Sequence, residues 1–268
     1  MKTFAYHRPE SVADAVALLG GREDARLFAG GMTLLPTMKQ RLVEPSDLID
    51  LSAVGELTGI SVADGRVTIG AMTTHGTVAD STEVAGAIPA LAELAGGIGD
   101  PQVRNRGTIG GSIANADPAA DYPAAVVALG ATVKTDRREI AGDDFFVDLF
   151  ETALEPGEMI VSVSFPVPTA AAYVKMPNPA SRYAIAGVFV ARFPDGVRLA
   201  VTGAGPSAFR VAAMEQALSE RFEPTALDGA RISPDGLNSD IHADAAYRAN
   251  LVRVLARRAV QKIQSAAS

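Results

Sequence analysis

Apolar stretches and turn-forming residues alternate along the first fifty residues in a pattern typical of a β–α–β unit. Apolar side chains recur at helical spacing over residues 12–19, and Gly20-Gly21 ends this predicted helix. A short apolar strand is expected over residues 26–29, and a helix over 36–42 with Pro36 in its first turn. Residues 47–51 predict another strand. A unit of this length matches one strand–helix–strand crossover.

The pattern changes after Ser52, where alternation of period two predicts antiparallel strands. Residues 60–62 and 67–69 flank Asp64-Gly65, an arrangement typical of a tight hairpin. A helix is expected over residues 84–95, and further strands over 131–135 and 160–165. Residues 96–121 are rich in Gly and Pro, and we predict a long loop there, of a length that usually serves a function.

Prolines between residues 166 and 179 mark a boundary region. Beyond it, residues 185–192 and 197–202 predict a second hairpin, followed by helices over 208–218 and 245–263. We therefore predict an α+β fold with two domains. Residues 1–170 form a two-lobed domain, with a small β–α–β lobe over about 1–54 and a larger lobe with an antiparallel sheet over about 55–170. A smaller α+β domain occupies residues 171–268.

Composition narrows the classes of function. The net charge of −7 argues against a nucleic-acid partner, because phosphate binding needs a basic surface. No apolar run approaches the ~20 residues of a membrane span, and residues 1–9 lack the apolar core of a signal peptide, so we expect a cytoplasmic protein. The absence of cysteine excludes disulfides and cysteine-ligated iron–sulfur clusters within this chain. His7, His75 and His242 lack ligand spacing, so no metal site is expected.

Two glycine pairs indicate ligand chemistry. Ala29-Gly30-Gly31-Met32-Thr33 and Thr108-Ile109-Gly110-Gly111-Ser112 each end in a hydroxyl residue. Paired glycines let the backbone approach a ligand closely, and successive free N–H groups form a cradle for phosphate. One such loop is weak evidence, but two in one chain suggest a ligand whose pyrophosphate is held from both sides.

The first glycine pair, with Asp50 twenty residues later, also imitates a nicotinamide-binding unit. The spacing departs from that motif, because Met32, Thr33 and Leu34 follow the pair in place of further glycines. Only one β–α–β unit precedes the hairpins, whereas a doubly wound sheet needs several. The nicotinamide interpretation is therefore a minor alternative.

The sequence around both glycine pairs resembles a known family. Residues 27–36 (LFAGGMTLLP), 99–112 (GDPQVRNRGTIGGS) and 113–121 (IANADPAAD) are similar to the FAD-binding medium subunit of molybdenum hydroxylases, which include aerobic carbon monoxide dehydrogenase and xanthine dehydrogenase. The resemblance covers the full length, with further matches at residues 70–75, 145–146 and 154–158. It implies a two-lobed FAD fold followed by a C-terminal flavoprotein domain that closes over the flavin.

The resemblance also implies which residues bind FAD. The two loops would hold its phosphates and ribityl chain through N–H groups and hydroxyls: Ala29, Gly30, Gly31, Met32, Thr33, Thr108, Ile109, Gly110, Gly111 and Ser112. Asp121 matches an acidic FAD contact and Ile160 an apolar one, while Tyr183 is placed beside the isoalloxazine ring, with Lys175 in the same segment. Met32 stands where relatives often carry Gln or His, so this position loses a polar side chain.

Several of these residues also have a purely structural interpretation. Asp117 and Asp121 each suit the cap of a helix beginning at Ala119; we favour capping for Asp117 and a ligand contact for Asp121. For Tyr183, stacking on flavin and a place in the core are about equally supported. Lys175 is expected to be solvated, and His75 to satisfy backbone groups.

Together these features predict a flavoprotein electron-transfer subunit with no catalytic residue of its own and no metal. Its FAD would take electrons from a small 2Fe-2S subunit, which relays them from a large subunit carrying the molybdenum cofactor. The resemblance implies a dimer of such heterotrimers. Two alternatives stay open at this point: a stand-alone FAD-dependent oxidase or reductase of the same fold, and an assembly module that has lost its cofactor.

Overall fold

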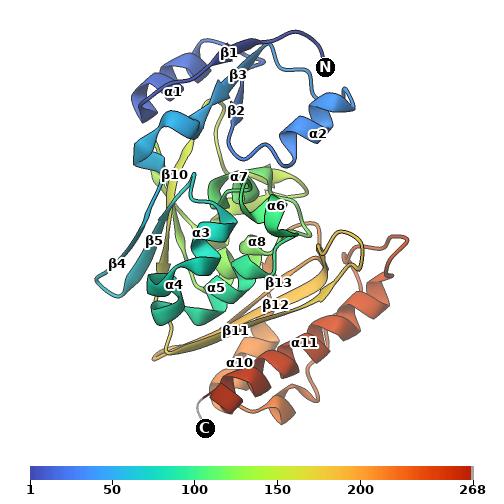
Figure 1. Cartoon of the computed structure of the whole chain (residues 1–268). Coiled ribbons are helices and arrows are strands. Elements are labelled where there is room, and N and C mark those ends of the chain that lie inside the picture. Colours follow the sequence, from blue (N-terminus) through green and yellow to red (C-terminus); the bar gives the residue numbers. More distant parts are fainter. Residues whose placement is uncertain (267–268) are drawn as a thin grey trace.

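The computed structural model describes residues 1–266. They fold into three parts in chain order, two lobes and a C-terminal part (Figure 1). The first lobe holds a parallel three-stranded sheet in the order β1-β3-β2. Its elements are β1 (Ala5–His7), α1 (Val12–Gly20), β2 (Arg26–Phe28), α2 (Leu34–Lys39) and β3 (Asp47–Asp50), followed by the 3-10 turns η1 (Leu51–Ala53) and η2 (Gly55–Leu57). The predicted β–α–β unit is confirmed, with β1 as an additional strand. The helix predicted over 36–42 lies earlier, since the chain turns helical directly after Thr33.

The second lobe contains an antiparallel five-stranded sheet in the order β4-β5-β10-β6-β7. These strands are β4 (Ile60–Ala63), β5 (Arg66–Gly70), β6 (Thr132–Thr135), β7 (Glu139–Ala141) and β10 (Ile160–Pro166). The predicted hairpin is confirmed, with Asp64 and Gly65 at positive φ in its turn. A two-stranded ribbon, β8 (Phe146–Asp148) and β9 (Glu151–Thr152), precedes β10.

Short helices pack around this sheet. They are α3 (His75–Asp80), α4 (Thr82–Ala87), α5 (Pro89–Gly96), α6 (Pro101–Arg104), α7 (Ile109–Asn115), α8 (Tyr122–Ala128) and α9 (Gly142–Phe145). The single helix predicted over 84–95 is wrong: Pro89 restricts Ile88 to a non-helical conformation, and the chain forms two helices there. The long loop predicted over 96–121 is also wrong, because α6 and α7 lie inside it.

The C-terminal part is a four-stranded antiparallel sheet with helices on its outer face (Figure 1). It comprises β11 (Ala170–Pro177), β12 (Ala184–Phe193), β13 (Gly196–Thr202), β14 (Phe209–Arg210), α10 (Ala212–Glu220), η3 (Pro224–Leu227) and α11 (Ala245–Ala266). Strand β11 was not expected, because prolines surround it. The helix predicted from residue 208 begins later, since residues 209 and 210 pair with β13.

Three hydrophobic clusters follow this arrangement, one in each lobe and one between the C-terminal sheet and its helices. Tyr173 and Phe189 of the C-terminal sheet belong to the core of the second lobe, so these two parts pack together. The predicted domain boundary near residue 170 stays a prediction. Among residues 1–266, no helix combines the length and apolar character that crossing a membrane requires.

Candidate functional site

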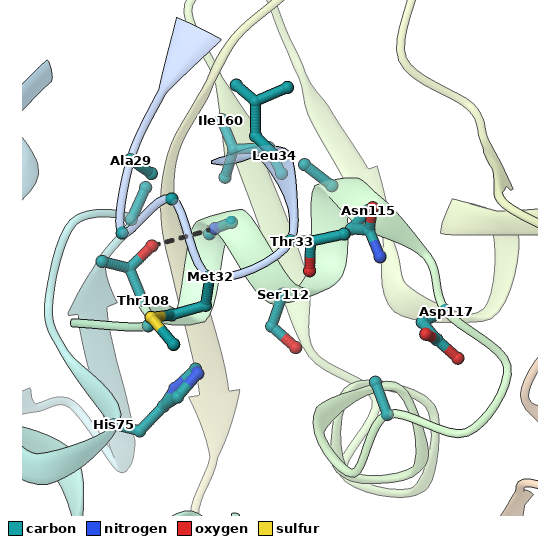
Figure 2. Close-up of a pocket in the computed structure, with 18 of the residues that line it drawn as sticks. Ala29, Met32, Thr33, Leu34, His75, Thr108, Ser112, Asn115, Asp117 and Ile160 are labelled. Atoms are coloured by element: carbon teal, nitrogen blue, oxygen red, sulfur yellow. Dashed lines mark hydrogen bonds between the residues drawn. The ribbon is translucent and has the colours of Figure 1, made fainter. Parts of the chain in front are cut away.

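A cavity of about 550 Å³ lies where the first lobe faces the second (Figure 2). Its walls come from the loop after β2, the segment from α6 to the start of α8, the start of β10, and the turn between β11 and β12. The volume is in the range typical of small-molecule and cofactor sites. Leu34 and Ile160 lie on one side of the cavity, and Asn115 and Asp117 on another.

The first glycine pair forms one wall of this cavity and has free backbone donors. Gly31 has φ +72, a conformation that favours glycine, and a Cβ on Gly30 would lie 2.0 Å from the carbonyl oxygen of Arg106. Within the described part of the chain, no acceptor is bonded to the N–H groups of five consecutive cavity-lining residues, Gly30, Gly31, Met32, Thr33 and Leu34. Such a row of unpaired amides at a helix start is suited to an anion.

The second glycine pair contributes differently, because it lies inside α7. The N–H of Ile109 donates to the Thr73 carbonyl at 3.1 Å, and that of Gly110 to the Ala71 carbonyl at 2.8 Å. The N–H of Gly111 donates to the Thr108 hydroxyl at 3.1 Å, the bond drawn in Figure 2. The open row of amides expected here is therefore absent, since these three donors already have acceptors.

Hydroxyl and amide side chains face the cavity beside α7. The side chains of Ser112, Thr33 and Asn115 line it and make no hydrogen bond to any of residues 1–266 (Figure 2). Gly110 lets α7 sit directly on residue 71, because its Cβ would lie 2.6 Å from the Ala71 Cβ. The second loop therefore supplies polar side chains at close range, and the first loop supplies backbone donors.

A buried carboxylate lies at the start of α8. Asp121 accepts hydrogen bonds from the Tyr173 hydroxyl and, at 2.9 Å, from the Lys175 ammonium. Burial raises the pKa of Asp121, while the charge of Lys175 and the bond from Tyr173 oppose this rise. The cap expected from Asp117 is wrong: its carboxylate accepts from the N–H of Ala119 at 2.9 Å in a turn, and α8 begins only at Tyr122.

The Lys175 ammonium donates hydrogen bonds to three acceptors, and this residue does not line the cavity. Besides Asp121, its ammonium donates to the carbonyls of Gly97 at 3.0 Å and Arg182 at 2.9 Å. The side chain is 12% exposed, so the expected solvated lysine is wrong. Tyr183 follows in the same turn, lines the cavity and is 44% exposed, which excludes its interpretation as a core aromatic.

His75 lines the cavity from the start of α3. Burial, followed by the nearby charge of Arg104, lowers the pKa of His75 to about 4, so the imidazole is neutral at pH 7. Its Nδ1 has no partner within residues 1–266, contrary to the expectation that it satisfies backbone groups. The hydroxyl of Tyr122 also has no hydrogen-bond partner within residues 1–266, and its ring centroid lies 5.4 Å from that of His75.

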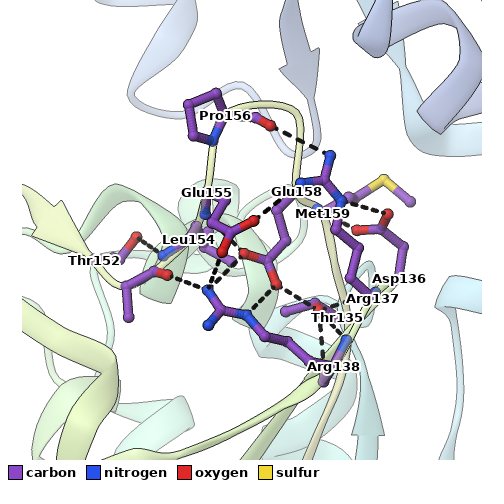
Figure 3. A network of polar contacts seen from close by, with 11 residues as sticks. Thr135, Asp136, Arg137, Arg138, Thr152, Leu154, Glu155, Pro156, Glu158 and Met159 are labelled. Carbon is purple, nitrogen blue, oxygen red and sulfur yellow. Dashed lines mark hydrogen bonds and ion pairs between the residues drawn. The ribbon is translucent and has the colours of Figure 1, made fainter.

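An ion-pair network holds the segment that leads to Ile160 (Figure 3). Glu158 accepts from Arg138 at 3.0 Å, from the Thr135 hydroxyl at 2.8 Å and from the N–H of Glu155 at 2.7 Å. The bond from Arg138 is the main reason that the pKa of Glu158 falls to about 2, against the opposing effect of burial. Glu158 and Ile160 both line the cavity, so this network fixes one of its walls.

The structure brings most of the expected site residues together. Those that line the cavity are Ala29, Gly30, Gly31, Met32, Thr33, Thr108, Gly110, Gly111, Ser112, Asp121, Ile160 and Tyr183. Ile109 is fully buried in the core, and Lys175 lies behind Asp121. Sequence reasoning missed Leu34 and Asn115, although both stand beside the motifs, and it missed the cavity position of His75.

Comparisons with known proteins show the family of this chain. Residues 2–168 match the family of FAD binding domains in molybdopterin dehydrogenase. The chain is 37% identical to the carbon monoxide dehydrogenase medium chain of Hydrogenophaga pseudoflava, over 96% of both proteins. It is 38% identical to the nicotine 6-hydroxylase medium subunit of Paenarthrobacter nicotinovorans, over 95% of both. The structure matches that of quinoline 2-oxidoreductase from Pseudomonas putida 86 with a TM-score of 0.90 and 31% identity, covering 100% of this chain and 99% of the other.

The family match and the named relatives thus identify an FAD-binding subunit of an oxidoreductase. More narrowly, the chain belongs to the family of FAD-binding domains in molybdopterin dehydrogenases, as do the medium chains of carbon monoxide dehydrogenase. The predicted family, fold and cofactor are confirmed, and the nicotinamide alternative is wrong, because only three parallel strands precede the antiparallel sheet. Relatives of this chain are named as medium chains or as subunits of dehydrogenase complexes, which also disfavours a stand-alone oxidase or reductase.

Proposed function

We propose that FAD binds in the cavity between the two lobes and that this chain is the electron-transfer subunit of a molybdenum-containing hydroxylase or dehydrogenase. The observation that carries the proposal is the row of unbonded N–H groups from Gly30 to Leu34 facing a cavity of cofactor size. Donors fixed in position before binding favour a pyrophosphate, because they need no reorganisation to receive its charge. This cradle also argues against an assembly module that has lost its cofactor.

The other cavity residues fit the remaining parts of FAD. The hydroxyls of Thr33 and Ser112 are free to bond phosphate or ribityl oxygens. Ile160 and neighbouring apolar residues offer a surface for a ring, and Tyr183 offers an exposed aromatic face on the C-terminal turn. Asp121 presents a carboxylate oriented by Tyr173 and Lys175. We assign cofactor-binding roles to the cavity-lining residues of both loops, and to Lys175 only through Asp121.

Bound FAD would supply the redox chemistry, accepting electrons from a partner and passing them to an external acceptor. The chain's own residues position the cofactor and shield it, and none is assigned acid–base work on an organic substrate. We propose a large subunit with the molybdenum cofactor and a small 2Fe-2S subunit as partners, in a dimer of heterotrimers. A cytoplasmic location stays a prediction from the sequence.

Titration of the apo-chain with FAD tests this proposal. We expect stoichiometric binding with quenched flavin fluorescence, and no comparable binding of NADH. The relatives are named for substrates as different as carbon monoxide and nicotine, so this chain does not define the substrate of the complex. An apo-chain that is folded yet binds no FAD would contradict the proposal.

A further inference from the structure

The cavity wall over residues 117–121 is held in place by the C-terminal sheet. The hydroxyl of Thr202, at the end of β13, donates to the carbonyls of Pro118 at 2.9 Å and Ala120 at 2.6 Å. The N–H of Gly203 donates to the Pro118 carbonyl at 2.7 Å, and that of Ala184 to the Ala119 carbonyl at 3.1 Å. Three successive carbonyls of this wall are therefore bonded by residues that lie beyond position 168.

Thr202 is the residue whose side chain bonds this wall. It is fully buried, and its hydroxyl has one proton shared between two carbonyls. Gly203 follows with φ +81, and a Cβ there would lie 2.4 Å from the Ala184 carbonyl oxygen, so the backbone turn beside Thr202 requires glycine. A hydroxyl fixed in this way determines where the carbonyls of Pro118 and Ala120 lie.

The held segment carries cavity-lining residues at both of its ends. Asp117, Ala120 and Asp121 line the cavity, and Thr202 does not. The carboxylate of Asp121 is oriented by Tyr173 and Lys175, which also belong to the C-terminal sheet. The same sheet thus fixes both the backbone of this wall and the side chain of its buried acid.

We propose that Thr202 is a positioning residue for the cofactor: by bonding the Pro118 and Ala120 carbonyls, it sets the wall that Asp117, Ala120 and Asp121 present to FAD. This inference rests on the proposed FAD site and goes beyond it, because it gives a buried side chain of the C-terminal sheet, outside the cavity, an indirect part in binding. Loss of the hydroxyl leaves the buried Ala120 carbonyl without this donor and the Pro118 carbonyl with the N–H of Gly203 alone, and the wall relaxes away from its binding position.

The test compares three variants of the full-length chain, each reconstituted from the apo-form with FAD. Thr202→Val keeps the side-chain shape and removes the hydroxyl, while Thr202→Ser restores it. Thr169→Val is the control for removing a threonine hydroxyl away from the cavity: the exposed Thr169, just before β11, donates to the Arg192 carbonyl of β12 at 2.8 Å and does not line the cavity. The measurements are the dissociation constant for FAD, the visible flavin spectrum, and the thermal midpoint with and without FAD.

We expect Thr202→Val to raise the dissociation constant for FAD about tenfold, a loss of the size expected for one buried hydrogen bond. Its flavin spectrum should shift, and the gain in thermal midpoint caused by FAD should shrink, because that gain depends on affinity. Thr202→Ser and Thr169→Val should bind FAD like the wild type.

A purely structural role for Thr202 would give a different result. Thr202→Val would then lower the thermal midpoint equally with and without FAD, at unchanged affinity and spectrum, and the proposal would be overturned. If Thr202→Val does not fold, Thr202→Ala provides the second test, since it removes the same hydroxyl with a smaller side chain. Unchanged FAD affinity and spectrum in that variant would overturn the proposal. A folded wild-type chain that binds no FAD would instead overturn the proposed FAD site itself.

Discussion

Gly30→Ala tests the close approach between the two lobes. In the structure, a Cβ at position 30 would lie 2.0 Å from the carbonyl oxygen of Arg106 and 2.8 Å from the Cα of Gly107. Both neighbours are backbone atoms, so neither can move aside as a flexible side chain would. The loop that carries the free amides must therefore retreat from the second lobe.

The size of the effect follows from that distance. Ordinary van der Waals contact begins near 3.4 Å, so the loop must shift by roughly 1.4 Å, which is enough to break hydrogen bonds of normal length. A hydrogen bond to a charged group contributes about 1.5–3 kcal/mol. Loss of two such bonds to phosphate, at the lower value, weakens FAD binding by about 3 kcal/mol, or roughly 100-fold.

The assay is titration of the apo-variant with FAD, followed by flavin fluorescence, with circular dichroism to confirm the fold. Gly86→Ala is the matched control, because Gly86 lies in α4 and its added Cβ would meet nothing within 4 Å beyond its chain neighbours and its own helix backbone. This control should bind FAD like the wild type. A folded Gly30→Ala variant with wild-type affinity would refute the argument that the two lobes must approach this closely.

Three further outcomes are expected. Gly111→Asp should abolish FAD retention, because its Cβ points between Thr108 and Ala29 and would place a carboxylate beside phosphate; a full complement of FAD in the purified variant would remove α7 from the site. Tyr183→Ala should keep FAD but change the flavin spectrum or electron-transfer rate, and stopped-flow reduction checks this. Glu158 has a pKa lowered to about 2 from 4.5, so it stabilises the fold above pH 4.5 and loses this effect as the pH falls toward 2. Between pH 4.5 and 2, the free energy of unfolding of the wild type should fall by an additional amount on the order of 1–2 kcal/mol, a figure reduced because Arg138 is half exposed. Glu158→Gln should lack this additional fall, and acid denaturation of both proteins checks it.

Much of the fold was predictable, because local signals and tertiary packing agree there. Residues 12–19 combine apolar spacing with a glycine stop, and Asp64-Gly65 specifies its hairpin. The secondary structure predicted from the sequence is wrong where tertiary packing outweighs the local preference of the residues. Gly110 and Gly111 suggest a loop, yet both lie in α7, and at position 110 only glycine lets this helix pack against Ala71 at this distance.

The candidate site was predictable in its residues and less so in their roles. The motifs identified both cavity-lining loops, but they did not distinguish free amides at Gly30 from amides already bonded at Gly110. That difference depends on contacts with residue 71, distant in the sequence. The burial of Lys175 behind Asp121 likewise depends on the packing of β11 against the second lobe, which no local pattern records.

We propose above that this chain carries FAD within a larger complex. The most direct measurement is the visible spectrum of the tagged chain purified gently from its native host, with identification of the released flavin and of co-purifying chains. We expect FAD in a stoichiometric amount, iron–sulfur absorbance and two additional subunits. A folded chain that arrives with its partners but without flavin, and that takes up no added FAD, would contradict it.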